Sequence, residues 1–203
     1  MGMAFDWEQR YAETSQLFGV APSELLVAEQ PRLKPGLTAL AVADGEGRNG
    51  VWLAEQGLKV TSVDISATAQ QRARAFAAQR NVHIDTFCVD LLNWPWPVNQ
   101  FDIVTCIFMH LPAPLLQKIH SAMWQAIKPG GLIMIEGFHV DQASHDSGGP
   151  KDPTILLSEC GLQQAFPDAE ILRLERVTTK VEIAGENLGE GIAIHYVARK
   201  PGE

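Results

Sequence analysis

The chain has 203 residues, of which 46% are hydrophobic and 20% charged, and its mean hydropathy is −0.03. This length and composition are typical of one globular domain and exclude a disordered or fibrous chain. Sixteen basic and 24 acidic residues give a net charge of −8, which is unfavourable for holding a phosphate backbone, so we expect no nucleic-acid partner.

Three cysteines, Cys88, Cys106 and Cys160, have neither the number of a disulfide framework nor the spacing of a metal site. Sparse, unpaired cysteines are typical of reduced cytoplasmic proteins. No apolar run approaches the ~18 residues of a membrane span, so we expect no membrane association. Early acidic residues argue against a secretory signal, and Asp6 stands where a myristoylation motif requires Ser or Thr. We therefore predict a cytoplasmic, metal-free monomer or homodimer.

The chain begins with two predicted amphipathic helices, one over residues 5–16 and one that starts at Pro22-Ser23. From residue 37, strands and helices alternate, which indicates βαβ units and a mostly parallel sheet with helices on both faces. The predicted strands are 37–43, 59–64, 82–89, 101–108 and 132–138. The predicted helices extend to Gly57, from Ser66 to near Asn81, and over 112–127.

The sequence becomes polar and rich in turn-forming residues after Phe138. Residues 139–153 form a loop long enough to suggest a functional role, and its part 141–153, with His145 and Lys151, is either the wall on the substrate side or a plain surface excursion. A helix is predicted around 154–166, followed by an antiparallel hairpin of 170–183 and 191–200. No linker divides the chain, so we predict a single domain over residues 1–203.

The strongest local motif is Ala43-Asp44-Gly45-Glu46-Gly47-Arg48-Asn49-Gly50, between the first strand of the sheet and the helix that follows it. Its glycines allow a tight turn and close approach of a ligand, and the helix N-terminus behind it offers free amides.

Two acids end the next strands. Asp64 lies nineteen residues beyond Gly45, where a carboxylate can accept both hydroxyl protons of an adenosine ribose. Asp90 ends the third strand and can accept a hydrogen bond from an adenine amine. The competing interpretations are that Asp64 caps the next helix and that Asp90 is a solvated loop acid.

The glycine pattern alone fits NAD as well as S-adenosylmethionine. The two strand-end acids, the turn at 128–131 and the terminal hairpin favour S-adenosylmethionine, and with them residues 5–200 resemble a class I S-adenosylmethionine-dependent methyltransferase. The segments 7–11, 45–49, 101–104 and 110–112 are most similar to the tellurite-resistance and thiopurine methyltransferase-like group.

The resemblance implies a three-layer, Rossmann-like α/β sandwich whose seven-stranded, mostly parallel sheet has the order 3-2-1-4-5-7-6, with strand 7 antiparallel. Residues 1–34 would form a helical lid and 37–200 the core. It also implies S-adenosyl-L-methionine as cofactor and a small-molecule methyl acceptor, for which a thiol or a chalcogen or metalloid anion is one interpretation. The cofactor-binding residues that it implies are Trp7, Tyr11, Ala43, Asp44, Gly45, Gly47, Arg48, Asn49, Asp64, Ile65, Asp90, Leu91, Ile107 and His110.

Two positions depart from the family's pattern. Ala41 stands where the family has a strand-one acid that helps to hold the cofactor's ammonium group, and Ala43 stands where it has the first loop glycine. Asp44 can partly replace the acid, and an alanine at 43 costs little unless its φ is positive. We therefore expect weaker cofactor binding, or backbone carbonyls in place of the missing acid.

Methyl transfer needs an acceptor positioned at an activated carbon with water excluded. A soft anion needs no general base, whereas a hydroxyl or an amine can need one. The candidate catalytic bases are His110, for which the alternative is a structural bond to a loop carbonyl, and Glu136, a buried acid that needs a partner such as Arg48 or Arg10. Arg48 is either an anion-binding cation or a solvated helix-start residue.

Two other functions stay open at this point. A nicotinamide-dependent oxidoreductase would fit the glycine pattern, although the two tyrosines, Tyr11 and Tyr196, do not form a Tyr-x-x-x-Lys pair. A non-catalytic S-adenosylmethionine-binding protein would fit the departures at Ala41 and Ala43.

Overall fold

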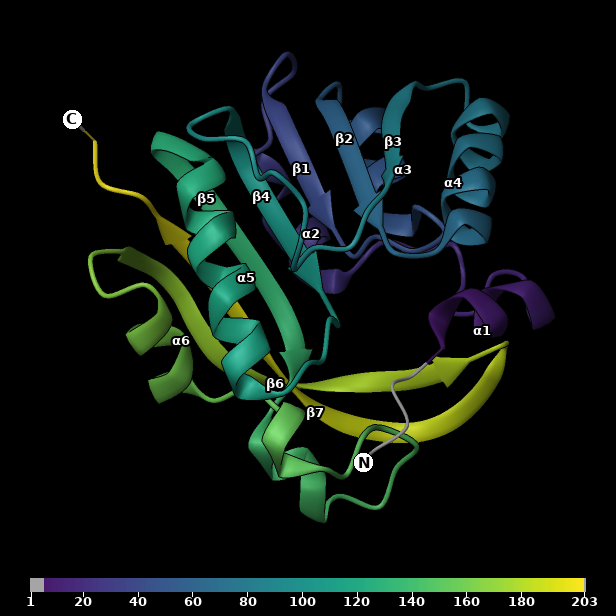
Figure 1. Cartoon of the computed structure of the whole chain (residues 1–203). Helices are drawn as coiled ribbons and strands as arrows, with labels where there is room; N and C mark the ends of the chain where they lie inside the picture. Colours follow the sequence, from purple (N-terminus) through teal and green to yellow (C-terminus); the bar gives the residue numbers. More distant parts are fainter. Residues whose placement is uncertain (1–5, 203) are drawn as a thin grey trace.

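The structure is a computed structural model that describes residues 6–202; the expectations for Met1, Gly2 and Phe5 fall outside this range. Within it, one sheet has the strand order β3-β2-β1-β4-β5-β7-β6 (Figure 1). Its strands are β1 (Thr38–Val42), β2 (Lys59–Asp64), β3 (Ile84–Cys88), β4 (Phe101–Ile107), β5 (Ile127–Phe138), β6 (Glu170–Ile183) and β7 (Glu186–Arg199). The strands β1 to β5 pair in parallel and β7 is antiparallel to both neighbours, so the predicted order and direction are confirmed.

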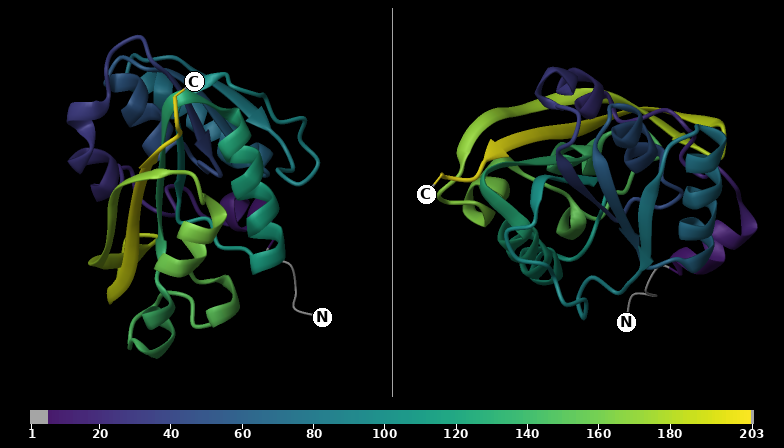
Figure 2. Two further views of the ribbon diagram at one scale, coloured as in Figure 1. Left: turned by 90° about the vertical axis from the view of Figure 1, so that its left-hand side faces the viewer. Right: turned by 90° about the horizontal axis from the view of Figure 1, so that it is seen from above.

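Helices cover both faces of this sheet, as Figure 2 shows. The helices are α1 (Trp7–Glu13), α2 (Glu24–Ala28), α3 (Arg48–Glu55), α4 (Ala67–Gln79), α5 (Ala113–Ala126) and α6 (Glu159–Ala165), with short 3₁₀ turns η1 (Gln30–Arg32), η2 (Val140–Ser144) and η3 (Pro153–Ile155). The core cluster on one face includes α2, α3 and α4, and the cluster on the other includes α5 and α6. The predicted three-layer sandwich is therefore confirmed.

Strand β1 shows why the sequence forms this architecture. Ala39 and Ala41 join the core cluster of α2, α3 and α4, whereas Leu40 and Val42 join the cluster of α5 and α6. A strand buried on both faces needs a continuous apolar run in place of an alternating one, which is what residues 37–43 supply. The helix α4 begins at the predicted cap, because the Ser66 hydroxyl accepts the Ala69 amide at 3.0 Å.

Three predicted boundaries are wrong, each for a local reason. Strand β5 starts at Ile127 and not at 132, because the turn before it continues as a bulged extension paired with β4. The helix predicted over 154–166 is limited to 159–165, since Pro153 starts a separate 3₁₀ turn and Ser158 caps α6. Strand β7 starts at Glu186, because Ala184 and Gly185, both with positive φ, form a two-residue turn.

The carboxyl ends of the parallel strands are covered by the β6–β7 hairpin and the loop 139–153, which come from distant parts of the sequence. The β6–β7 hairpin extends past the sheet toward α1 in Figure 1, and the Ala184 amide donates to the Leu17 carbonyl at 2.7 Å. The loop 139–153 is tied to the hairpin by the Gly148 amide, which donates to the Leu188 carbonyl at 2.9 Å. These contacts close the edge where ligands bind in open α/β sheets. Residues 6–202 contain no helix with the length and apolar character needed to cross a bilayer.

Candidate active site

The glycine loop connects β1 to α3 through left-handed backbone. Ala43 has a φ of 52° and Gly47 a φ of 85°, and Gly47 is the N-cap of α3 without a side-chain cap. A Cβ on Gly47 would lie 2.8 Å from the Ala73 Cβ, so both conformation and space require glycine there. Ala43 adopts the positive φ that the sequence suggested, at a modest strain cost. Gly47 has no side chain to cap α3, so the first-turn amides other than that of Gly50, which Asp44 accepts, are offered at the sheet edge.

The Asp44 carboxylate lies close to Ala41. A Cβ on Gly50 would lie 2.3 Å from Asp44 Oδ2 and 3.6 Å from the Ala41 Cβ, which places the carboxylate beside the alanine. Asp44 Oδ1 accepts the Gly50 amide at 3.1 Å and Oδ2 accepts the Ser62 hydroxyl at 2.8 Å. Burial raises the pKa of Asp44 to about 7. Its two oxygens therefore join the glycine loop to α3 through Gly50 and to β2 through Ser62.

Asp64 binds the glycine loop directly. Its Oδ2 accepts the Gly45 amide and its Oδ1 the Ser66 amide, each at 2.9 Å. The side chain is 6% exposed, and burial raises its pKa. Ser66, and not Asp64, caps α4. Because each carboxylate oxygen has two lone pairs, Asp64 keeps acceptor capacity for two hydroxyl groups.

Asp90 lies beyond the end of β3, at the same edge as Asp64, because the Val89 amide donates to the Asp64 carbonyl at 2.8 Å. Asp90 is exposed, and its carboxylate accepts from the Leu92 amide at 3.0 Å and the Asn93 side chain at 2.6 Å. These bonds order the turn that follows the strand.

Apolar side chains accompany the two acids. Ile65 follows Asp64 and is 56% exposed, an unusual setting for an isoleucine beside a polar cluster. Leu91 is half-buried and packs on the core, and its carbonyl accepts the Trp96 indole N–H at 2.8 Å. Trp94 and Trp96, with ring centroids 4.8 Å apart, also pack on the core and cover the sheet edge.

Helix α1 lies directly on the glycine loop. A Cβ on Gly45 would lie 2.3 Å from the Tyr11 hydroxyl, and Tyr11 is 5% exposed. Burial and the carboxylates of Asp64, Glu46 and Asp44 raise the pKa of Tyr11 well above its usual range. Trp7 packs beside it, with ring centroids 6.0 Å apart. A ligand that contacts the Cα of Gly45 must displace the Tyr11 hydroxyl.

Two glutamates that the sequence analysis missed fasten this helix. Glu8 accepts from the hydroxyls of Ser66 and Thr68, each at 2.6 Å. Glu46, inside the glycine loop, accepts the backbone amides of residues 16 and 17 at 2.9 and 2.7 Å, and pairs with Arg72 at 3.0 Å. No local pattern signals these contacts, because each joins residues at least 26 positions apart.

Glu136 is buried in a polar network with Ser23 and His195, and of the two arginines expected beside it, Arg48 interacts with it through charge. Its carboxylate accepts the Ser23 hydroxyl and lies 3.2 Å from His195 Nε2. The Ser23 amide in turn donates to Asn49 Oδ1 at 2.9 Å, which joins the network to α3. His195 is opposite Glu136 because the two residues are register partners of β5 and β7. Ser23 and His195 were not predicted from sequence.

Arg48 is a half-buried cation without an ion-pair partner among residues 6–202. Its guanidinium donates to the Ala21 carbonyl at 3.0 Å. Burial lowers its pKa, and the charges of Glu136 and Asp44 act in the opposite direction. A guanidinium has five N–H donors, so Arg48 retains donors for an anionic ligand.

An aromatic wall lies where β4 and β5 end. Phe108 and Phe138 have centroids 4.9 Å apart, and the His110 ring stacks on Phe138 at 5.4 Å. Ile107, before them, is buried in the core. His110 Nδ1 lies 3.2 Å from the Ile155 carbonyl, the structural contact that the sequence suggested. Its Nε2 is buried and has no hydrogen-bond partner among residues 6–202.

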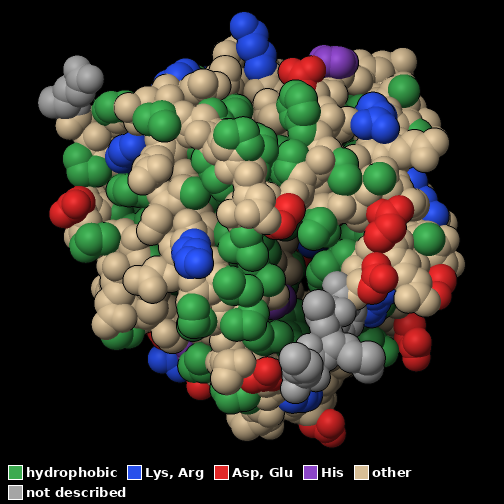
Figure 3. Space-filling view, viewed as in Figure 1, with side chains coloured by type: hydrophobic (Ala, Val, Ile, Leu, Met, Phe, Trp, Pro, Cys, Tyr) green, Lys and Arg blue, Asp and Glu red, His purple; other side chains and the backbone are tan. Residues whose placement is uncertain are grey.

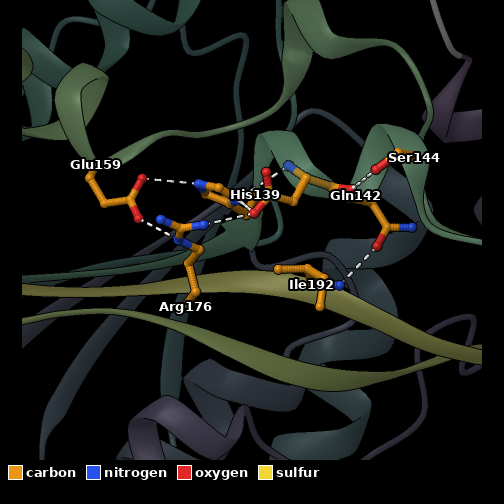
Figure 4. Close-up of polar contacts among 7 residues, drawn as sticks. His139, Gln142, Ser144, Glu159, Arg176 and Ile192 are labelled. Carbon is orange, nitrogen blue, oxygen red and sulfur yellow. Dashed lines mark hydrogen bonds and ion pairs between the residues drawn. The ribbon is translucent and has the colours of Figure 1, made fainter.

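The loop 139–153 is anchored to the sheet by an ionic network (Figure 4). His139 Nε2 lies 3.0 Å from Glu159, and Arg176 pairs with Glu159 at 2.7 Å and with Asp141 at 2.9 Å. The buried Gln142 accepts the Ile192 amide at 2.9 Å. Lys151 donates to the carbonyl of His145, so its ammonium group bonds to the backbone of its own loop. Residues 6–202 contain no cluster of three or more potential metal ligands from His, Cys, Asp and Glu.

Comparison with known proteins decides between S-adenosylmethionine and NAD as the cofactor. A family model described as "Methyltransferase domain" matches residues 39–131. The ubiquinone biosynthesis O-methyltransferase of Coxiella burnetii is 31% identical over 204 residues, which cover 96% of this chain and 82% of the relative. The chain belongs to the class I S-adenosylmethionine-dependent methyltransferases. Its cofactor is S-adenosyl-L-methionine, so the nicotinamide interpretation is set aside.

Solved methyltransferase structures share the fold. TehB from Haemophilus influenzae superimposes with a TM-score of 0.71 at 19% identity, over 96% of this chain and 67% of that one. Magnesium protoporphyrin IX methyltransferase from Synechocystis, solved with bound SAH, gives 0.66 at 17% identity, over 86% and 78%. These likenesses concern the fold alone, so membership of the tellurite-resistance group stays a prediction.

Proposed function

We propose that this methyltransferase acts on a small molecule and holds S-adenosylmethionine at the carboxyl edge of β1, β2 and β3. The observation that supports the proposal most strongly is the hydrogen bond from the Gly45 amide to Asp64. It makes the acidic end of β2 and the glycine loop one preformed unit, with the exposed Asp90 at the same edge. A carboxylate for ribose hydroxyls and amides for anionic groups are the donors and acceptors that such a nucleoside requires.

The remaining residues suit the other parts of the cofactor. Ile65 and Leu91 would contact the adenosine, and the methionine arm would lie between the helix start at Arg48 and the strand end at Ile107. Trp7 and Tyr11 would cover it from α1. Asp44 is bonded to its own loop, and we propose that it supports that loop and leaves the cofactor's ammonium group to backbone carbonyls. When bound, the cofactor supplies a methyl group made reactive by a positively charged sulfur.

A small acceptor is consistent with the segments that cover the site. The helix α1, the β6–β7 hairpin and the loop 139–153 are hydrogen-bonded to one another or to the edge, which leaves little approach for a macromolecule. Figure 3 shows a hollow near the middle of the face seen in Figure 1, with hydrophobic side chains around it and a histidine at its floor. Such a site orients a small molecule and excludes water.

We propose a hydroxyl oxygen as the acceptor atom, because the relatives from Coxiella burnetii are O-methyltransferases. The second candidate is a soft anion, such as a thiolate or a chalcogen or metalloid oxyanion. Arg48 favours it, since a half-buried cation without an ion-pair partner among the described residues can bind an anion. The free thiols of Cys88, Cys106 and Cys160 support the proposal that the enzyme works in the cytoplasm.

Calorimetry on purified protein tests the cofactor site. We expect binding of S-adenosylmethionine and S-adenosylhomocysteine and none of NAD. Asp64→Asn should weaken binding about 10- to 100-fold, since hydrogen bonds to a charged group contribute about 1.5–3 kcal/mol. Asp85→Asn is the matched control, because Asp85 is an exposed β3 carboxylate whose side chain lies beside His83. An Asp64→Asn protein that binds as tightly as the wild type would refute the proposed site.

A further inference from the structure

His110 is held at the reacting edge of the sheet by the strands on either side. It lies three residues beyond Ile107, the last residue of β4, whose register partner in β5 is Glu136. The Phe108 amide donates to the Glu136 carbonyl at 2.7 Å, which extends the pairing past the strand end. A Cβ on Gly137 would lie 3.5 Å from His110 Cε1, so the ring packs over the end of β5.

The contact to Ile155 defines which ring nitrogen carries the proton. A carbonyl oxygen only accepts hydrogen bonds, so His110 Nδ1 at 3.2 Å must be the N–H donor. A neutral imidazole has one N–H, which leaves a lone pair on Nε2. Burial lowers the pKa of His110 to about 4, so the ring is neutral at pH 7.

A buried acceptor without a donor is costly, and proteins rarely leave one without a reason. His120 Nε2 is also unpartnered among the described residues, but its ring packs against Phe166 in the helix layer of α5 and α6. His110 differs because it lies at the ligand-binding edge, beside Phe108 and Phe138, which are only half-buried. A ligand bound at this edge can supply the hydrogen-bond donor that His110 Nε2 lacks among the described residues.

Building on the proposed function, we propose that His110 is the general base and that the acceptor is a small phenol. The phenol ring would pack against Phe108 and Phe138, because both phenylalanine rings are half-buried and aromatic rings associate favourably with one another. Its hydroxyl would donate to His110 Nε2, the acceptor that lacks a partner in the described residues.

The chemical step balances with this one base. The phenol proton moves to His110 Nε2 while an oxygen lone pair bonds the methyl carbon and the carbon–sulfur electron pair stays on sulfur. The chain then holds an imidazolium at His110, which returns its proton to water when the site opens. A thiolate acceptor needs no proton removed, so His110 should matter only for hydroxyl acceptors.

The test compares catechol with thiophenol, a matched aromatic acceptor that is already ionised near neutral pH. His110→Gln should lower kcat for catechol about 100-fold or more, the usual contribution of a general base, and leave its KM within about twofold. Thiophenol methylation and the affinity for S-adenosylhomocysteine should change less than about threefold. His83→Gln is the matched control, because His83 is exposed and precedes β3, at the end of the strand opposite to the proposed site. For the wild type, the catechol rate should fall at acid pH as His110 becomes protonated.

A measurement without turnover checks the same nitrogen. Nitrogen-15 NMR of labelled cofactor-free protein should show His110 as the Nδ1–H tautomer, neutral down to about pH 5. A proton on Nε2, or an unchanged catechol rate in His110→Gln, overturns the proposal. So does S-adenosylhomocysteine binding with no transfer to catechol, in which case the cofactor site stands. Failure to bind S-adenosylhomocysteine at all would instead refute the proposed function.

Discussion

The two halves of the site are built in different ways. In the cofactor half, Asp64 binds Gly45 nineteen residues away and Asp44 binds Gly50 six residues away. In the acceptor half, the contacts of Glu136 with Ser23 and His195 span 113 and 59 residues. The first half is a strand–loop–helix–strand unit that orders itself locally, whereas the second exists only once the whole sheet has formed. Mutations should therefore act differently in the two halves.

The acceptor half should show the largest loss of stability. Glu136→Ala leaves the Ser23 hydroxyl and His195 Nε2 buried without their shared partner, and should cost about 2–4 kcal/mol of unfolding free energy. Glu136→Gln keeps an acceptor and a donor in place and should cost about half as much or less. Urea unfolding of both variants measures the difference. An alanine variant as stable as the wild type would show that the long-range network contributes nothing.

The cofactor half should respond to pH through Asp44. The pKa of Asp44 is raised to about 7 in the folded chain, against 3.8 for the free group, so between these values the folded state binds a proton that the unfolded state has lost. Its stabilising contribution is therefore complete below about pH 4 and is lost as the pH rises to about 7. Asp44→Asn lacks this dependence.

The unfolding free energy of Asp44→Asn relative to the wild type should therefore rise with pH across this window. At about 1.4 kcal/mol per pKa unit, the rise is on the order of a few kcal/mol. Urea unfolding at pH 4.5, 6 and 8 gives the curve. A difference that is flat or falls with pH contradicts the buried, protonated Asp44.

A smaller effect in the cofactor half concerns backbone strain at Ala43. Its φ of 52° is left-handed, so Ala43→Gly should stabilise the protein by about 0.5–1 kcal/mol. Ala41→Gly, inside the buried strand β1, is the control and should destabilise it by about 1 kcal/mol. Thermal unfolding compares the two variants. Equal losses at both positions would mean that the loop carries no strain.

The smallest change is expected outside both halves, at Tyr196, whose ring stacks on Phe166 in the core cluster of α5 and α6. Its hydroxyl is buried and has no hydrogen-bond partner among residues 6–202. Tyr196→Phe removes an unsatisfied polar group and should change stability by between zero and about +1 kcal/mol. A loss of more than 1 kcal/mol in urea unfolding would reveal a partner, such as a buried water, for that hydroxyl.

Several features of the site follow a local rule that sequence alone can express. Ser66 follows a strand and precedes an alanine-rich run, so its capping of α4 was predictable. The glycine loop was predictable because glycine alone suits Gly47, whose φ is 85° and whose Cα packs against Ala73. The wrong start of β5 arose because pairing with the neighbouring strand β4 extends it, and the wrong start of α6 arose because Pro153 opens a separate 3₁₀ turn before the Ser158 cap.

Other features have no local signal. For Glu136, sequence shows that a buried acid needs a partner, but not that a serine and a histidine from distant segments bond it while Arg48 acts on it through charge. The contacts of Glu8, Glu46 and Ser23 likewise depend on how α1 and α2 fold back onto the sheet. Phe108 and Phe138 form one wall only because β4 and β5 are neighbours.

The amino-acid sequence by itself determined the alternation of strands and helices, the turn before α3 and the acids that end β2 and β3, because side-chain periodicity and backbone preference act within a few residues. Only the tertiary structure decided which groups meet above the sheet: Tyr11 over Gly45, His195 against Glu136, and His110 beside two phenylalanines with its Nε2 unpartnered within residues 6–202. Hydrogen bonds and burial between distant segments have this property, since their free energy is realised only after the chain has closed the loops between them.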